Sequence, residues 1–225
     1  MRAEEDPVQR SIKVLAISAS KGGTGKTTIS AALSVAALGD GDKVAILDLD
    51  PLQSLTRWHE LRGGVGTGPE LISVRGGVAA TLERLRRENF DWVFVDTPPS
   101  SLSAIEPVVE ASDMTLIVVQ ASVFDVEGVE PIVEIAKRKG KPFVFVLNRV
   151  EPRSKYKLTE DAVAFLQEDG RVLKQTISNR EVHKAAAVQG KSAAELKDSK
   201  ASEEIGALWK EVKKLVGTAV RRQAR

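Results

Sequence analysis

The chain of 225 residues contains no cysteine. Without thiols it can form no disulfide, and cysteine-ligated metal sites and iron–sulfur clusters are excluded. No apolar run approaches the ~18 residues that a membrane span requires. Positive and negative charges nearly balance, since the net charge is only +2. Any attraction to nucleic acid must therefore come from local clusters of basic residues.

Length and composition fit one globular domain. The chain has 42% hydrophobic and 28% charged residues, which is ordinary for such a domain, and its length provides ample core for one open α/β sheet. Residues 1–10 are charged, include Pro7 and contain no apolar stretch, so we expect a short mobile tail and no secretory signal. We predict a single domain over residues 11–225 and a cytoplasmic protein.

Short β-branched runs alternate with helical patterns along the chain, which is typical of βαβ units and a mainly parallel sheet. The runs 93–95 and 116–119 are apolar on both faces, as expected for central strands covered on both sides. The predicted fold is therefore α/β, an open, mainly parallel twisted sheet flanked by helices. We expect strands at residues 12–18, 43–48, 71–74, 92–96, 115–119 and 143–147, and helices at 26–38, 53–61, 78–88, 102–110, 126–138, 158–168 and 205–220.

A glycine-rich segment over residues 21–28, with the sequence KGGTGKTT, follows the first predicted strand and precedes a helix. This is the setting of a phosphate-binding loop. Glycines let the backbone N–H groups turn inward, and the helix adds its positive N-terminal end. Lys26 would lie near the β- and γ-phosphates, and the Thr27 hydroxyl can hold Mg²⁺. The predicted nucleotide-binding residues of the loop are Gly22, Gly23, Thr24, Gly25, Lys26, Thr27 and Thr28.

Two aspartates, Asp48 and Asp50, lie where the second long strand is predicted to end. Alternation along the strand sends both to the same side, and ligands of open α/β sheets bind beyond the carboxyl ends of the strands. Two carboxylates there can order Mg²⁺ and its waters. A pair of aspartates that caps a helix or forms a turn at the strand end is the alternative interpretation.

Two further strand ends carry polar residues. The run Trp92–Val95 ends in Asp96, the pattern of a Walker B strand whose aspartate holds Mg²⁺ through water. Asn148 follows the strand at 143–147 and is either a nucleotide contact or a common turn former. The chain has no Asn-Lys-x-Asp guanine motif, so we expect ATP with Mg²⁺, and Thr27, Asp48 and Asp96 as the metal site.

The glycine-rich loop departs from the general pattern G-x-x-x-x-G-K-[ST]. Ser20 stands where the first glycine would be, and a second lysine, Lys21, opens the loop. With Asp48-Leu49-Asp50-Pro51 and Asp96-Thr97-Pro98-Pro99, this loop resembles the deviant Walker A motif of the ParA/MinD ATPases. The resemblance is to the small ParA type and runs from about residue 12 to residue 215.

The resemblance implies roles for single residues. Lys21 would reach across a dimer interface to the nucleotide of the partner subunit, and Asp50 would orient the attacking water, which with Lys26 completes the expected catalytic set. Asp48 would lie in the outer shell of the metal, and Asn148 would contact adenine. The family commonly has glutamine directly after the proline, whereas this chain has Leu52 and then Gln53, so a role for Gln53 stays open.

The resemblance also implies a function: a weak, Mg²⁺-dependent ATPase that forms a homodimer with ATP, binds non-specific DNA on the nucleoid and drives plasmid or chromosome partition with a stimulating ParB-like adaptor. A positioning ATPase for a protein cargo is a close alternative, and a MinD-like membrane-cycling regulator is a third. The missing cysteines exclude the nitrogenase-iron-protein-like branch. We see no second-substrate constellation for a ligase, and the single tyrosine, Tyr156, does not fit a tyrosine kinase tail. His183 is expected on a helix surface.

DNA contacts must be predicted from charge, because non-specific affinity comes from neutralised phosphates. The candidates are Lys184, Lys210, Lys213, Lys214, Arg221 and Arg222, although a solvated basic face would look the same. The apolar stripe of the last helix, from Ile205 to Ala219, fits either a membrane-surface helix or a helix packed on the sheet. We favour the packed helix and expect no membrane partner.

Overall fold

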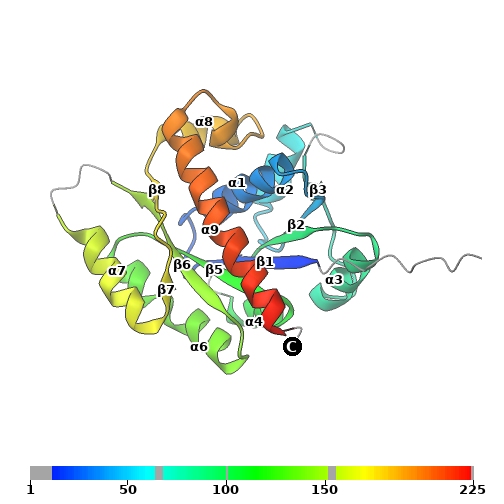
Figure 1. Ribbon diagram of the computed structural model, residues 1–225, viewed down its shortest axis with the longest axis horizontal. Coiled ribbons are helices and arrows are strands. Elements are labelled where there is room, and N and C mark those ends of the chain that lie inside the picture. Colours follow the sequence, from blue (N-terminus) through cyan, green and yellow to red (C-terminus); the bar gives the residue numbers. More distant parts are fainter. Residues whose placement is uncertain (1–11, 64–67, 100, 152–155, 224–225) are drawn as a thin grey trace, which may run out of the picture.

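The computed structural model describes residues 12–63, 68–99, 101–151 and 156–223 (Figure 1). The predicted tail over residues 1–10 lies outside the described residues. One parallel sheet has the strand order β3-β2-β4-β1-β5-β6-β7, and β8 also pairs with β6. The strands are β1 (Lys13–Ser18), β2 (Val44–Asp48), β3 (Glu70–Leu71), β4 (Trp92–Asp96), β5 (Met114–Val119), β6 (Phe143–Val150), β7 (Arg171–Val172) and β8 (Ile177–Ser178).

Helices cover both faces of this sheet. Side-chain alternation makes this possible, because Leu15 and Ile17 point into one core cluster while Val14 and Ala16 point into another. The first face carries α1 (Lys26–Gly39), α2 (Ser54–Leu61) and α9 (Ser199–Gln223), with α8 (Glu181–Ala187) and the 3₁₀ helix η1 (Ala193–Glu195) packed beside α1 and α9. The second face carries α3 (Val78–Arg87), α4 (Leu102–Ala111), α5 (Val123–Glu127), α6 (Glu130–Arg138) and α7 (Leu158–Asp169).

The predicted fold class is confirmed, with two kinds of difference in the elements. The helix expected over 126–138 is two helices, because α5 ends at Glu127 and α6 has Pro131 in its first turn. Proline lacks an N–H group and fits a helix start better than a helix interior. The short elements β7, β8, α8 and η1 were not predicted, because two-residue strands and single turns carry no readable periodicity.

The last helix belongs to the core. Leu208, Val212 and Val216 of α9 are buried against the sheet, and the ring of Trp209 meets that of Trp92 edge to face at 4.8 Å. The Trp209 indole donates a hydrogen bond to Asp40 (2.8 Å). The packed-helix interpretation of the apolar stripe is therefore confirmed. None of the helices in the described part of the chain is long and apolar enough to cross a membrane.

Candidate nucleotide-binding site

The strand order brings the predicted motifs to one edge of the sheet. β1 lies between β4 and β5, and Asp48 of β2 is in register with Asp96 of β4. The carboxyl ends of these parallel strands therefore share an edge, where open α/β sheets bind ligands. A cavity of about 550 Å³ opens there. Among its lining residues are Gly22, Gly23, Gly25, Lys26, Thr27, Thr28 and Asp50.

The glycine-rich loop is held from behind by the neighbouring strand ends. Asn148, near the carboxyl end of β6, donates a 2.6 Å hydrogen bond to the Thr24 carbonyl. Gln120, the residue after β5, donates one to the Gly23 carbonyl at 3.2 Å. Gly25 has a φ of 101°, and a Cβ there would lie 2.1 Å from the Asn148 amide nitrogen. Only glycine fits this position. These two side chains occupy carbonyl groups of the loop and leave its N–H groups as donors. That arrangement suits an anion site, since phosphates bind to hydrogen-bond donors.

Asn148 thus supports the loop, and its predicted contact with adenine stays a prediction. Gln120 was missed by sequence reasoning, because a glutamine at a strand end carries no motif. Its position after β5 was the available signal.

Thr27 and Asp96 form the part of the site that suits a metal. The Thr27 hydroxyl donates to Asp96 at 2.7 Å. Asp96 is fully buried, and its second carboxylate oxygen has no partner among the described residues. Burial raises the pKa of Asp96 to about 7, although Thr27 and Lys26 oppose the shift. A buried carboxylate with a free oxygen beside a hydroxyl is the oxygen ligand set that Mg²⁺ prefers, so Mg²⁺ fits these two residues.

The two aspartates at the end of β2, Asp48 and Asp50, have different hydrogen-bond partners. Asp48 accepts hydrogen bonds from the Thr56 amide (2.8 Å) and hydroxyl (3.0 Å) with one oxygen, and from the Asp50 amide (3.1 Å) with the other. It therefore caps the first turn of α2, the alternative that the sequence left open, and its outer-shell role at the metal stays a prediction. Asp50 lines the cavity and accepts one bond from the Leu52 amide (3.0 Å).

The two lysines that frame the loop also differ. Lys26, the first residue of α1, is buried in the cavity wall. The Lys21 ammonium points instead to α5, where it lies 2.8 Å from the Asp125 carboxylate. Ser122 donates a hydrogen bond to the same carboxylate and accepts one from the Asp125 amide. Sequence reasoning missed Asp125, and the spacing Ser122-x-x-Asp125, typical of a capped helix start, was its only signal.

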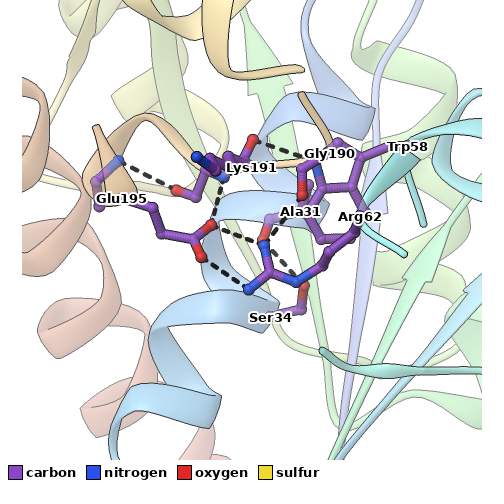
Figure 2. A network of polar contacts seen from close by, with 9 residues as sticks. Ala31, Ser34, Trp58, Arg62, Gly190, Lys191 and Glu195 are labelled. Atoms are coloured by element: carbon purple, nitrogen blue, oxygen red, sulfur yellow. Dashed lines mark hydrogen bonds and ion pairs between the residues drawn. The ribbon is translucent and has the colours of Figure 1, made fainter. Parts of the chain in front are cut away.

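The far wall of the cavity joins α2 to the segment before η1 (Figure 2). The Arg62 guanidinium makes two hydrogen bonds to Glu195 (2.8 and 2.7 Å) and one to the Gly190 carbonyl (3.0 Å). The Trp58 indole donates to the Lys191 carbonyl at 3.1 Å. Because α2 begins just after Asp50, this helix connects the carboxyl edge of the sheet to the opposite wall of the cavity.

His183 lies on the helix α8, but it is half-buried and not fully exposed as a surface residue would be. It lines the cavity together with Arg149, whose φ is 54°, and neither ring nitrogen has a partner among the described residues although both are buried. Desolvation lowers the pKa of His183, so the imidazole is neutral at pH 7. A smaller cavity of about 120 Å³ adjoins it, and Thr28, Asn148 and Lys184 are part of its wall.

The predicted DNA-binding residues lie in two separate places. Lys184 is on α8, beside the N-terminal end of α9, and the others are on α9 toward its C-terminal end (Figure 1). The 25 residues of α9 span roughly 37 Å. Lys213 is already paired with Asp40 (2.7 Å) and Asp42 (3.3 Å). The exposed members are Lys184, Lys210, Lys214 and Arg221, and the Arg222 side chain lies outside the described part.

Comparison with known proteins agrees with this geometry. A family model described as the CobQ/CobB/MinD/ParA nucleotide binding domain matches residues 15–193. The chain belongs to this family. It is 33% identical over 210 residues to maintenance of carboxysome distribution protein A of Halothiobacillus neapolitanus, covering 88% of this chain and 95% of that protein. The chromosome-partitioning ATPase Soj of Thermus thermophilus is 28% identical over 146 residues, or 52% of this chain and 59% of Soj.

Solved structures show the same ParA/MinD fold. The MinC:MinD cell division protein complex of Aquifex aeolicus matches with a TM-score of 0.73 at 20% identity, covering 89% of this chain and 96% of that chain. The ATP complex of a McdA variant from Cyanothece matches with a TM-score of 0.72 at 21% identity, covering 93% of this chain and 96% of that chain. At such identities the likeness supports the fold, and the residue roles must be argued from this chain.

Proposed function

We propose that this ParA/MinD-family chain is a weak, Mg²⁺-dependent ATPase that dimerises with ATP, binds DNA non-specifically in that state and positions a cargo through a stimulating adaptor. One observation carries the proposal: Lys26, Thr27 and Asp50 line one cavity at the carboxyl edge of the sheet, with the buried Asp96 bonded to Thr27. Phosphoryl transfer to water needs such positioning and charge neutralisation more than covalent chemistry.

Each residue has a part in this reaction. The loop amides and Lys26 neutralise the phosphates in cis, and Thr27 with Asp96 holds Mg²⁺, which supplies further positive charge at the phosphates. Asp50 orients the attacking water. Half of the Lys21 side chain is exposed, so it can leave Asp125 and serve the nucleotide of a second subunit. Asn148, which also donates a hydrogen bond to the Thr24 carbonyl, contacts the adenine base in this proposal.

The similar proteins indicate what kind of cargo this chain could position. Two carboxysome distribution proteins share 33% and 31% identity with this chain over most of their length, which favours a protein assembly as the cargo. Plasmid or chromosome partition with a ParB-like adaptor is the second candidate, and the match to Soj supports it. A MinD-like membrane cycle is less favoured, because the apolar stripe of α9 is buried in the core.

DNA binding is expected from the basic end of α9. Lys210, Lys214 and Arg221 are exposed there, and a dimer would double the number of phosphates that they neutralise. Such binding would place the protein on the nucleoid.

The first test is co-sedimentation with non-specific duplex DNA and, in parallel, with anionic liposomes, under ATP, ADP and no nucleotide. We expect salt-sensitive DNA binding with ATP alone and no liposome binding. ATP-dependent liposome binding without DNA binding would overturn the proposal in favour of the MinD-like alternative.

Two variants test the catalytic assignments. Lys21→Ala should bind ATP but lose stimulated turnover by about 10²-fold, the usual effect of removing one group that stabilises the transition state. Asp50→Ala should accumulate as an ATP-bound dimer. Full turnover by the first variant, or a monomer with ATP for the second, would remove the corresponding role.

A matched pair of triple variants tests the DNA surface. Replacing Lys210, Lys214 and Arg221 by glutamine should lower the salt dependence of DNA binding by about 0.9 in log–log slope for each phosphate that is no longer neutralised. The control replaces Arg84, Arg86 and Arg87 of α3 by glutamine, on the other face of the sheet. Equal weakening of DNA binding in both proteins would mean that overall charge, and not α9, determines binding.

A further inference from the structure

Exposed apolar side chains are concentrated at one place away from the nucleotide cavity. Nine large apolar residues are exposed in the described part of the chain, and five of them lie on α5 or on α7 and the residues just before it. The chain has only three tryptophans, one tyrosine and six phenylalanines, yet three of these are among the five. These five residues, which we call the α5–α7 patch, are Val123, Phe124, Tyr156, Leu158 and Phe165.

Three residues of the patch border a groove. Between α5 and α7 lies a cavity of about 220 Å³, and Val123, Val126, Leu158 and Phe165 are among the residues that line it. Phe124 is 82% exposed and Phe165 is 47% exposed. Exposed apolar residues beside a groove, with protruding aromatic rings, are typical of protein interaction sites, because aromatic anchors contribute much of the binding energy of an interface.

The charged residues of the groove indicate what kind of partner could bind there. The charged residues that line the groove are both acidic, Glu127 and Asp161, and Glu160 lies beside Asp161 in the first turn of α7. Within the described residues neither Glu127 nor Asp161 forms an ion pair with a lysine or arginine. The exposed Lys157 precedes Leu158, but the charged groups in the groove wall itself are the two carboxylates, which attract a basic partner.

We propose that the groove between α5 and α7 docks a segment of a partner protein that carries apolar anchors and flanking lysine or arginine residues. Apolar side chains would enter between Val126 and Phe165, and the basic residues would pair with Glu127 and Asp161. The inference names the docking surface of the adaptor in the proposed function, and it rests on that function only for calling the partner an adaptor.

The position of the groove gives docking a consequence for the nucleotide site. Val123, Val126 and Glu127 line the groove, and Asp125 between them holds Lys21. Because α5 has only five residues, a partner that moves it also moves the carboxylate that holds Lys21. Docking here therefore acts on the lysine that the proposed mechanism delivers to the second subunit.

The test uses two synthetic peptides of about five helical turns, one with leucines on one face and lysines on the other, and one with glutamates in place of the lysines. Fluorescence anisotropy with the full chain should show binding of the lysine peptide and none of the glutamate peptide. Phe165→Ala should weaken binding about tenfold or more, as expected for an interface anchor. The matched control Leu102→Ala, at an exposed leucine of α4, should bind like the wild type.

Charge reversal gives a second measurement that misfolding cannot imitate. The double variant Glu127→Lys and Asp161→Lys should prefer the glutamate peptide. Unchanged preference, or equal weakening of binding in Phe165→Ala and Leu102→Ala, would overturn the proposal. Nucleotide-independent self-association that Phe165→Ala abolishes in sedimentation velocity would also overturn it, because the occupant would then be a second copy of the chain.

The docking proposal and the proposed function can fail independently, and the experiments distinguish the two failures. Phe165→Ala lies outside the nucleotide cavity and should keep the basal ATP hydrolysis and the ATP-dependent DNA binding of the wild type. A wild type that binds the lysine peptide but neither hydrolyses ATP nor binds DNA would refute the proposed function and leave the docking groove intact.

Discussion

The ammonium of Lys21 lies 2.8 Å from the carboxylate of Asp125, and the two side chains differ sharply in exposure, at 50% and 2%. The second oxygen of Asp125 is buried without a partner among the described residues. Asp125 therefore depends on Lys21 and Ser122 for compensation of its charge, whereas Lys21 has water as an alternative. The pair holds the Lys21 ammonium on α5, and Lys21 is not among the residues that line the nucleotide cavity.

Lys21→Ala should destabilise the nucleotide-free protein by about 1–3 kcal/mol, because it leaves a buried carboxylate short of a partner. Asp125→Asn should cost less, since Lys21 can turn to water. Urea denaturation of both variants and of the double variant gives their coupling, which we expect to be about 0.5–3 kcal/mol.

Lys139 offers the control for this double-mutant cycle, because its partner Glu110 is exposed and its partner Glu106 is partly exposed, whereas Asp125 is buried. Lys139→Ala should change the free energy of unfolding by less than about 1 kcal/mol. Additive effects of Lys21→Ala and Asp125→Asn would show that the ion pair contributes nothing to stability.

Asp125→Asn should also favour the ATP-dependent dimer. If Lys21 must leave Asp125 to reach a second subunit, weakening the pair raises the population of the competent state and the apparent affinity rises with it. Light scattering at increasing protein concentration with ATP should show the dimer at lower concentration than in the wild type. A dimer that forms at higher concentration would mean that Asp125 helps to build the interface.

Gly25→Ala should abolish nucleotide binding without unfolding the protein. The φ of 101° is strained for alanine, and its Cβ would lie 2.1 Å from the Asn148 amide. The double variant with Asn148→Gly removes the clash but keeps the strain, so it should recover only part of the affinity. Calorimetric titration with ATP measures both, and Gly39→Ala in the last turn of α1, where a Cβ meets nothing within 4 Å, is the matched control.

The strand-end motifs were predictable because each is local. A β-branched run followed by Asp96, or by the glycine-rich loop, can be recognised as a strand-end motif from about ten residues of sequence. Once the strands are parallel neighbours, their carboxyl ends lie at the same edge of the sheet. The sequence could not decide between metal ligand and helix cap for Asp48, because that choice depends on whether Thr56 turns back toward it.

Contacts between distant segments had no local signal. Arg62 and Glu195 are 133 positions apart, and neither lies in a motif. The burial of His183 likewise results from the packing of α8, a helix of seven residues that carries too little periodicity to be predicted. The parts of the site that the sequence missed are thus those that tertiary packing creates.

The Arg62 clamp should matter for stability more than the exposed pair of Arg57 and Glu60. Arg62→Met keeps the stem but removes the guanidinium donor of the Gly190 carbonyl and of Glu195, which keeps only the Ser192 amide, and this should cost about 1–3 kcal/mol. Arg57→Met, in an exposed pair with Glu60 on the same helix, should cost less than about 1 kcal/mol. Equal destabilisation of both variants in urea denaturation would mean that the α2–η1 connection adds nothing.

His183 should make the nucleotide-free protein less stable in mild acid. Desolvation lowers its pKa below the ordinary 6.5, a shift that Arg180 supports and that Glu204 and Asp198 oppose. Between these two pKa values the unfolded chain binds a proton that the folded chain does not, so stability falls as the pH drops below about 6.5.

As the pH falls from about 7.5 to 5.5, the free energy of unfolding of the wild type should therefore fall relative to that of His183→Gln. Asp96, with its raised pKa, acts in the opposite direction, but it is present in both proteins and cancels in their difference. His59, whose pKa burial also lowers, should add to the effect, so the difference from the wild type should change most for the variant without either histidine. A difference between wild type and His183→Gln that does not change over this range would show that the imidazole titrates as it does in the unfolded chain.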